Sequence, residues 1–104
     1  MLFRSAIRNA CKKLKTFDLS GCELYASCEP CPMCLSAIYW ARLDKVYYAN
    51  TKEDARGINF DDDFIYQELK LPKEERSLKI EQLGREDAIK IFKKWAEKND
   101  KTAY

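Results

Sequence analysis

The stretch Ser27-Cys28-Glu29-Pro30-Cys31-Pro32-Met33-Cys34 carries the strongest chemical signal in this sequence. Pro32 fits the first turn of a helix, where its missing N–H costs nothing. A helix that starts here brings the sulfurs of Cys31 and Cys34 to one side, and two thiolates at that spacing can hold one Zn²⁺. The helix dipole is expected to lower the pKa of these thiols. The stretch therefore predicts half of a zinc site at the start of a helix.

The other half of such a site is harder to find. A catalytic zinc ion usually takes three protein ligands and a water molecule, and the 104 residues include no histidine. Two other interpretations of the cysteines are a structural zinc knuckle and a thioredoxin-like redox pair. Irregular spacing disfavours a knuckle completed by Cys11, Cys22 and Cys28, and the strand ahead of the motif lacks the turn of the redox fold. We expect Cys11 and Cys22 to be structural and Cys28 to be a small packed residue.

The rest of the sequence predicts alternating helices and strands. Hydrophobic periodicity predicts helices over residues 3–14, 32–42, 61–69 and 84–98, and strands over 22–27, 45–49 and 77–83. The second helix is apolar nearly all round, so we expect it to be buried. Asp61, the first of three consecutive aspartates, is the expected cap of the third helix. This alternation indicates an α/β layered domain with some parallel strand pairing.

Composition restricts the compartment and the partners. The 19 basic and 17 acidic residues are well mixed and leave a net charge of +2, which makes no electrostatic case for a nucleic-acid or membrane partner. No apolar run reaches the roughly 18 residues that span a bilayer, and the first five residues lack the apolar core of a secretory signal. Five cysteines, three of them within seven residues, fit a reducing compartment. We therefore expect a cytoplasmic protein.

Taken together, the motifs resemble the cytidine deaminase-like zinc enzymes, and within them the bacterial guanine deaminases. The resemblance rests on the blocks YASCEPCPMC (25–34), AIYWAR (37–42) and FDDDFIY (60–66) and on Tyr104. The first two blocks are shared with relatives that act on cytosine or on tRNA adenosine, whereas the third block and the terminal tyrosine are more particular to guanine deaminases. The resemblance implies a single partial deaminase domain over residues 1–104. Its fold would be a three-layer α/β/α sandwich without the family's N-terminal helix and β-hairpin.

The resemblance also implies roles for individual residues. Cys31 and Cys34 would be zinc ligands, and Asp62 would be a catalytic carboxylate that handles a proton beside the bound guanine. The substrate-binding side chains would be Trp40, which walls the base pocket, and Tyr104, which closes a pocket of the partner subunit in a domain-swapped homodimer. The backbone of residues 27–29 would contact the base or its leaving amine.

Each of these residues also has a plainer interpretation that does not depend on the family. A tryptophan on an apolar helix is most often a core residue, and an aspartate at a helix start favours the helix dipole. A terminal tyrosine is usually part of a frayed chain end. The roles of Trp40, Asp62 and Tyr104 therefore depend on the resemblance.

The histidine and the glutamate that complete the family's zinc site are absent from the aligned positions of this sequence. Alignment with the family's first helix puts Met1 where the zinc histidine belongs and Phe3 where the proton-carrying glutamate belongs. Two thiolates leave Zn²⁺ under-coordinated, and a phenylalanine cannot move protons. We therefore expect an N-terminally shortened guanine deaminase, a zinc enzyme whose parent hydrolyses the purine base guanine to xanthine and ammonia, and we expect this chain to be inactive as printed.

The sequence leaves two alternatives to guanine deamination open. The same zinc site could act on tRNA adenosine or free cytosine, although tRNA binding usually needs a basic surface. A non-catalytic fragment that serves binding or dimerisation is the alternative from another class. Uncovered sheet edges count against it, because they are templates for aggregation.

Overall fold

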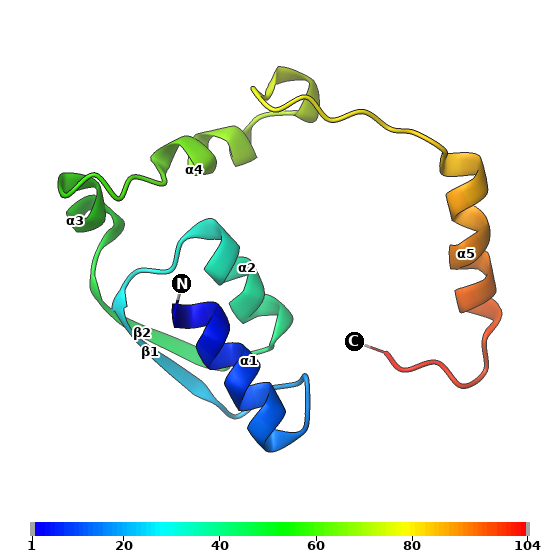
Figure 1. Ribbon diagram of the computed structural model, residues 1–104, viewed down its shortest axis with the longest axis horizontal. Coiled ribbons are helices and arrows are strands. Elements are labelled where there is room, and N and C mark those ends of the chain that lie inside the picture. The colour runs from blue at the N-terminus through cyan, green and yellow to red at the C-terminus, as the bar shows by residue number, and fades with distance from the viewer. Residues whose placement is uncertain (1, 104) are drawn as a thin grey trace. The chain divides into compact units, whose positions relative to one another are not determined.

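The computed structural model describes residues 2–103 and forms two compact units, one ending at Leu71 and one beginning at Pro72 (Figure 1). The first unit includes every element around the cysteine motif. The second unit includes one α-helix and longer irregular stretches. Among the described residues, no helix combines the length and the apolar character needed to cross a membrane.

The first unit alternates helices and strands, as the periodicity predicts. Its elements are α1 (Leu2–Leu14), β1 (Glu23–Cys28), α2 (Pro32–Trp40), β2 (Lys45–Asn50), α3 (Lys52–Gly57) and α4 (Asp63–Lys70). The short helix α3 was not predicted, because its six residues carry no clear apolar period. It starts with a capping box, in which the Thr51 hydroxyl accepts the Asp54 N–H at 3.2 Å and the Asp54 carboxylate accepts the Thr51 N–H at 2.9 Å.

The strands β1 and β2 pair in parallel and are connected through α2, which makes a βαβ unit. In this register Tyr25 lies opposite Tyr47, and their rings stack with centroids 4.8 Å apart. The Lys45 ammonium lies 4.6 Å from the Tyr47 ring centroid. These contacts fix the register on one face of the strand pair.

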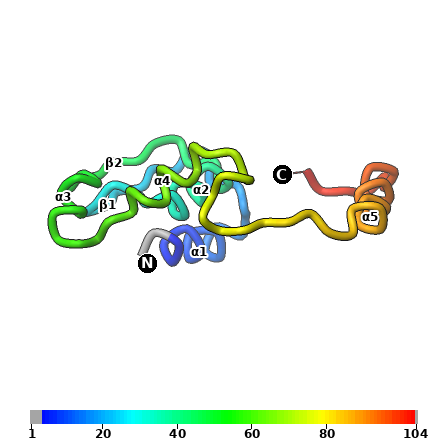
Figure 2. Tube along the Cα trace, turned by 90° about the horizontal axis from the view of Figure 1, so that it is seen from above, coloured from blue at the N-terminus to red at the C-terminus, as the bar shows by residue number. Residues whose placement is uncertain are grey.

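The buried core of the first unit is small. Helix α1 contacts α2 (Figure 2), and the buried apolar residues are Leu19, Cys34, Ile38 and Ala41. The Leu19 N–H donates to the Ala41 carbonyl at 2.8 Å, which ties the turn after α1 to the end of α2. Gly21 makes this turn possible because its φ of +87° is one that side chains disfavour. The core therefore gathers around the helix that starts at the cysteine motif.

The expectation that α2 is buried was wrong. Only Pro32, Cys34 and Ile38 are buried, whereas Tyr39 is 76% and Trp40 is 69% exposed. The composition of a helix shows that it has apolar side chains on every side, but only neighbouring elements can cover those sides. The described residues cover one side of α2 and leave the other side exposed.

The second unit differs from the sequence-based expectation at one place. It includes a short 3₁₀ turn (η1, Lys73–Glu75) and helix α5 (Arg85–Glu97). The strand predicted over residues 77–83 is wrong, because these residues are irregular. An alternating pattern becomes a strand only when a neighbouring strand takes its N–H and C=O groups, and strand pairing among the described residues is confined to β1 and β2. No residue of α5 is buried, and its apolar side chains Ile91, Phe92 and Trp95 are exposed.

Candidate metal site

The cysteine motif lies at the junction of β1 and α2, as predicted. Cys31 is the N-cap of α2, Pro32 occupies the first turn, and the Leu35 N–H donates to the Cys31 carbonyl at 2.8 Å. The Cys31 side chain makes no capping hydrogen bond. Its backbone therefore starts the helix, while its sulfur remains available to a ligand.

The two thiols of the motif lie together. Cys34 is fully buried, Cys31 is half-buried, and the two thiols share a hydrogen bond. Burial, followed by this hydrogen bond, raises the pKa of Cys34 to about 11, and the Arg4 guanidinium in the first turn of α1 acts in the opposite direction. For Cys34, desolvation therefore outweighs any lowering of the pKa by the helix dipole. A metal ion changes this balance, because a coordinated thiol is deprotonated outright.

The pair fits two of the four positions of a tetrahedral zinc site. Zn²⁺ prefers thiolate and imidazole ligands, and two thiols within hydrogen-bond distance of each other can converge on one ion. Across residues 2–103, no group of three or more cysteine, aspartate or glutamate side chains lies close enough together to hold a metal ion. The described residues therefore supply half of the ligands that zinc requires.

The loop that carries the thiols is held by residues from the following elements. The Glu29 N–H donates to the Asn50 carbonyl at 2.8 Å, and the Asn50 side-chain amide donates to the Ser27 carbonyl at 3.1 Å. One carboxylate oxygen of Glu29 accepts the backbone N–H of Lys52 at 2.8 Å. These bonds connect the end of β1 to the end of β2 and the start of α3. They also occupy backbone groups of residues 27–29 that the resemblance assigns to the base.

Tyr66 brings the predicted carboxylate close to the metal loop. Its hydroxyl donates to the Pro30 carbonyl at 3.3 Å, and the Lys52 ammonium lies 4.5 Å from its ring centroid. Burial raises the pKa of Tyr66, and the charges of Asp62, Glu29 and Cys31 raise it further. The structure thus places Asp62 and Cys31 around one tyrosine. A pocket of about 150 Å³ next to them is lined by Glu29, Pro30, Leu35, Val46, Tyr48 and Tyr66.

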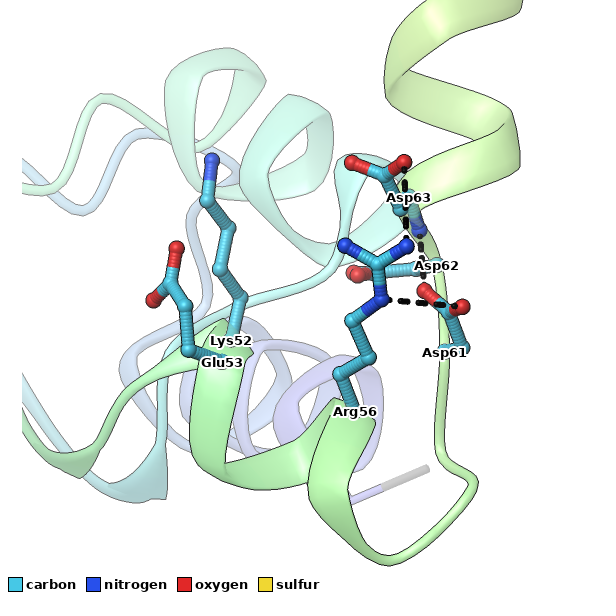
Figure 3. A pocket seen from close by; sticks show the side chains of 6 residues that line it. All are labelled: Lys52, Glu53, Arg56, Asp61, Asp62 and Asp63. Atoms are coloured by element: carbon cyan, nitrogen blue, oxygen red, sulfur yellow. Dashed lines mark hydrogen bonds and ion pairs between the residues drawn. The ribbon is translucent and has the colours of Figure 1, made fainter.

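The three consecutive aspartates have different surroundings. Arg56 lies 3.4 Å from an Asp61 oxygen and 3.8 Å from an Asp63 oxygen, and Asp61 also accepts the Asp63 N–H at 2.8 Å. Asp62 is the N-cap residue of α4, but its side chain makes no capping hydrogen bond. Figure 3 shows the Asp62 side chain pointing into a pocket of about 30 Å³ that Arg56 and Lys52 also line. Arg56 therefore engages the flanking carboxylates and leaves Asp62 directed at the pocket.

The two predicted substrate-binding residues, Trp40 and Tyr104, are not found beside the metal loop and Asp62. Trp40 ends α2, at the opposite end of the helix from the thiols, and lines an open hollow of about 430 Å³ with Ser36, Tyr39 and Arg42. Tyr104 lies outside the described residues. Met1 lies there as well, so the position aligned with the zinc histidine is not described. The substrate-binding roles of Trp40 and Tyr104 stay predictions.

Three residues at this site were missed by the sequence reasoning: Tyr66, Lys52 and Arg56. A signal for Tyr66 was present, because it follows Asp62 by four residues and therefore shares one helix face with it. Lys52 and Arg56 belong to α3, the helix that the periodicity did not reveal.

Comparison with known proteins agrees with this geometry. Residues 4–50, which include α1, the metal loop and the strand pair, match the family described as the cytidine and deoxycytidylate deaminase zinc-binding region. This stretch is therefore similar to the zinc-binding region of that family. The α/β class and Zn²⁺ as the cofactor, both expected from the sequence, are thereby supported on the residues that form the thiol pair.

The similarity to known deaminases extends beyond the zinc-binding region. The chain is 47% identical over 100 residues to the guanine deaminase of Bacillus subtilis, which covers 96% of the chain and 64% of that protein. The X-ray structure of the B. subtilis guanine deaminase matches with a TM-score of 0.89 and 43% identity, over 98% of the chain and 65% of that structure. A tRNA-specific adenosine deaminase of Aquifex aeolicus is 42% identical over 53 residues, or 51% of the chain and 35% of that protein. The chain therefore spans slightly less than two thirds of its guanine deaminase relative.

Proposed function

We propose that this chain supplies the zinc thiolates and a catalytic carboxylate of a guanine deaminase, which hydrolyses guanine to xanthine and ammonia. The extent of the similarity carries this proposal. The B. subtilis guanine deaminase matches 96% of the chain, whereas the tRNA-specific adenosine deaminase of A. aeolicus matches 51%. Since the longer match extends over both compact units, we also propose that they belong to one deaminase domain.

The proposed division of labour combines the geometry of the thiols with the roles that the family resemblance implies. Cys31 and Cys34 would hold Zn²⁺, which when bound acidifies a water molecule so that hydroxide exists near neutral pH. Asp62 is half-buried and makes no capping hydrogen bond, so its carboxylate is proposed to take the proton-transfer role beside the base that the family resemblance implies. Trp40 and Tyr104 are proposed to contact the base, as the family resemblance implies.

A chimera tests the proposed activity. The matching 100 residues of the B. subtilis guanine deaminase would be replaced by those of this chain, and ammonia release from guanine would be measured. We expect the chimera to be active with Zn²⁺, and we expect the separate 104-residue chain to be inactive, because its described residues supply two zinc ligands and no third. A folded chimera without guanine deaminase activity would contradict the proposal.

The same chimera separates the alternative substrates. Cytosine and a tRNA anticodon stem would be offered beside guanine under equal conditions. The balanced charge of this chain favours the small base over tRNA. Faster deamination of the tRNA stem or of cytosine than of guanine would replace guanine as the proposed substrate.

We further propose a cytoplasmic homodimer that exchanges its C-terminal segment. Support comes from α5, which has no buried residue and exposes Ile91, Phe92 and Trp95. An amphipathic helix gains most of its stability by burying its apolar face against another element, and a second copy can offer that element. All five cysteines are free thiols, which fits a reducing compartment. Cell fractionation would test the location, and recovery in a secreted fraction would contradict it.

A further inference from the structure

The hydrogen bond from Tyr66 to Pro30 connects two parts of the site that are 36 residues apart in the sequence. Pro30 is buried and immediately precedes Cys31. As a proline it has no N–H, so its carbonyl is the one polar backbone group through which the protein can hold it. The orientation of the Pro30–Cys31 peptide therefore depends on what this carbonyl contacts.

The position of this peptide sets the position of both sulfurs. Cys31 is the N-cap of α2, and its carbonyl accepts the Leu35 N–H, so rotation of the preceding peptide moves the first turn that carries Cys34. The other bonds to this loop reach Ser27 and Glu29, ahead of the proline. Among the described contacts, the Tyr66 hydroxyl is the tertiary hydrogen bond nearest in sequence to the thiols.

Tyr66 is itself held in place. Its ring lies beneath the Lys52 ammonium, with 4.5 Å between the nitrogen and the ring centroid, and its backbone N–H donates to the Asp62 carbonyl at 3.2 Å. The Tyr66 side chain therefore connects the start of α3 to the metal loop, and its backbone belongs to the turn that follows Asp62. A displacement of Tyr66 would be transmitted both to Asp62 and to the thiols.

We propose that Tyr66 is a positioning residue that sets the geometry of the Cys31–Cys34 thiol pair through the Pro30 carbonyl and couples it to the turn that presents Asp62. The inference rests on the proposed function for the meaning of the thiol pair as a metal site. The structural part of the inference is that Tyr66 keeps the first turn of α2 closed around Cys34. This part can be tested without any metal.

The test compares Tyr66→Phe with Tyr39→Phe in the 104-residue chain. Both variants remove one hydroxyl and keep the ring, but Tyr39 is 76% exposed on α2. Alkylation of each cysteine by iodoacetamide would be followed by mass spectrometry. Because Cys34 is fully buried, its reaction reports opening of the turn. Loss of one hydrogen bond should speed Cys34 alkylation about fivefold in the Tyr66 variant, with Cys22 unchanged and no effect in the Tyr39 variant.

Two results would overturn the inference. An unchanged Cys34 rate in the Tyr66 variant would show that the hydroxyl does not hold the turn. Equal acceleration of Cys11, Cys22 and Cys34 would show a general loss of stability instead of a positioning role.

A Co²⁺ titration links the inference to the metal. The sulfur-to-cobalt charge-transfer absorption would be followed in all three proteins, and the Tyr66 variant should need about fivefold more Co²⁺ for half of the signal. Equal midpoints in the three proteins would contradict the coupling to the thiol pair. If the unsubstituted chain develops no band, the titration is repeated in the chimera, where absence of the band would contradict the proposed metal role of the thiols; the alkylation rates decide the role of Tyr66 in either case.

Discussion

The carboxylate of Glu29, on the metal loop, accepts the backbone N–H of Lys52 at 2.8 Å, across 23 residues of sequence. Lys52 is the first residue of α3, whose early N–H groups have no partner inside the helix. One side chain therefore satisfies a helix terminus and holds the loop ahead of Cys31. The stability of the loop and the stability of α3 are consequently linked.

Replacing Glu29 tests this link. Glu29→Ala should lower the free energy of unfolding by about 1 kcal/mol, because it removes one hydrogen bond to a charged acceptor. Glu29→Gln, which keeps an acceptor oxygen, should lose less. Urea unfolding followed by circular dichroism measures both. Glu53→Ala is the control, since it removes a negative charge from the first turn of α3, the turn whose Lys52 N–H the Glu29 carboxylate accepts. Equal losses in Glu29→Ala and Glu53→Ala would show that charge alone is responsible.

Acid should destabilise the start of α3. The Thr51 backbone N–H and hydroxyl donate to Asp54 and hold the pKa of that carboxyl below its ordinary value. A depressed folded-state pKa stabilises the fold above the unfolded pKa, and this contribution is lost as the pH falls below about 4.

Asp54→Asn should therefore lose less stability than the unsubstituted chain between pH 7 and pH 3, because its capping box is already weakened. Urea midpoints at the two pH values provide the comparison, with Glu53→Gln as the neighbouring control. A steeper acid loss in Asp54→Asn than in the unsubstituted chain would contradict the assignment.

Zinc should stabilise the chain through its thiol pair. At a free Zn²⁺ concentration of about 100 times Kd, ligand linkage raises the melting temperature of a domain of this size by about 10 °C. We expect Cys31→Ser to abolish this shift and Cys22→Ser to keep it, because Cys22 lies outside the motif. Circular dichroism melting with Zn²⁺ and with a chelator measures the shift. A shift of the same size in the Cys31 variant would place the metal elsewhere.

Asp62 should matter for turnover and little for stability. In the active chimera, Asp62→Asn should reduce ammonia release about 10²- to 10⁴-fold, the usual contribution of a proton-transfer group. Its side chain makes no capping hydrogen bond, so the melting temperature should change little. Asp63→Asn is the matched control, because Asp63 pairs with Arg56. Equal activity losses in the two variants would remove the special role of Asp62.

The apolar face of α5 should decide the oligomeric state. Burying a phenylalanine contributes about 1.5–3 kcal/mol, so Phe92→Glu should weaken a dimer by at least about tenfold. Lys93→Glu, which also adds a negative charge to α5, should leave the dimer intact. Size-exclusion chromatography with light scattering distinguishes the species. A monomer in the unsubstituted chain at all concentrations would contradict the proposed exchange.

Most elements of the first unit could be predicted from local signals. Pro32 after Cys31 indicated the start of α2, and residues 45–49 indicated β2, because these signals arise within a few residues. The strand expected over residues 77–83 did not form, because strand pairing is a property of two segments and among the described residues it is confined to β1 and β2. Helix α3 was missed because its stability comes from the Thr51–Asp54 box and not from an apolar period.

The sequence by itself determined which reactive groups the protein carries: two thiols three residues apart at a helix start and a carboxylate beside two others, in blocks that resemble a family of zinc deaminases. The tertiary structure decided how these groups are held. It buried Cys34 and so raised the pKa of its thiol, paired Arg56 with the aspartates around Asp62, and placed Tyr66 against the Pro30 carbonyl. Burial and long-range hydrogen bonds depend on segments that meet only in the folded chain, so no local pattern encodes them.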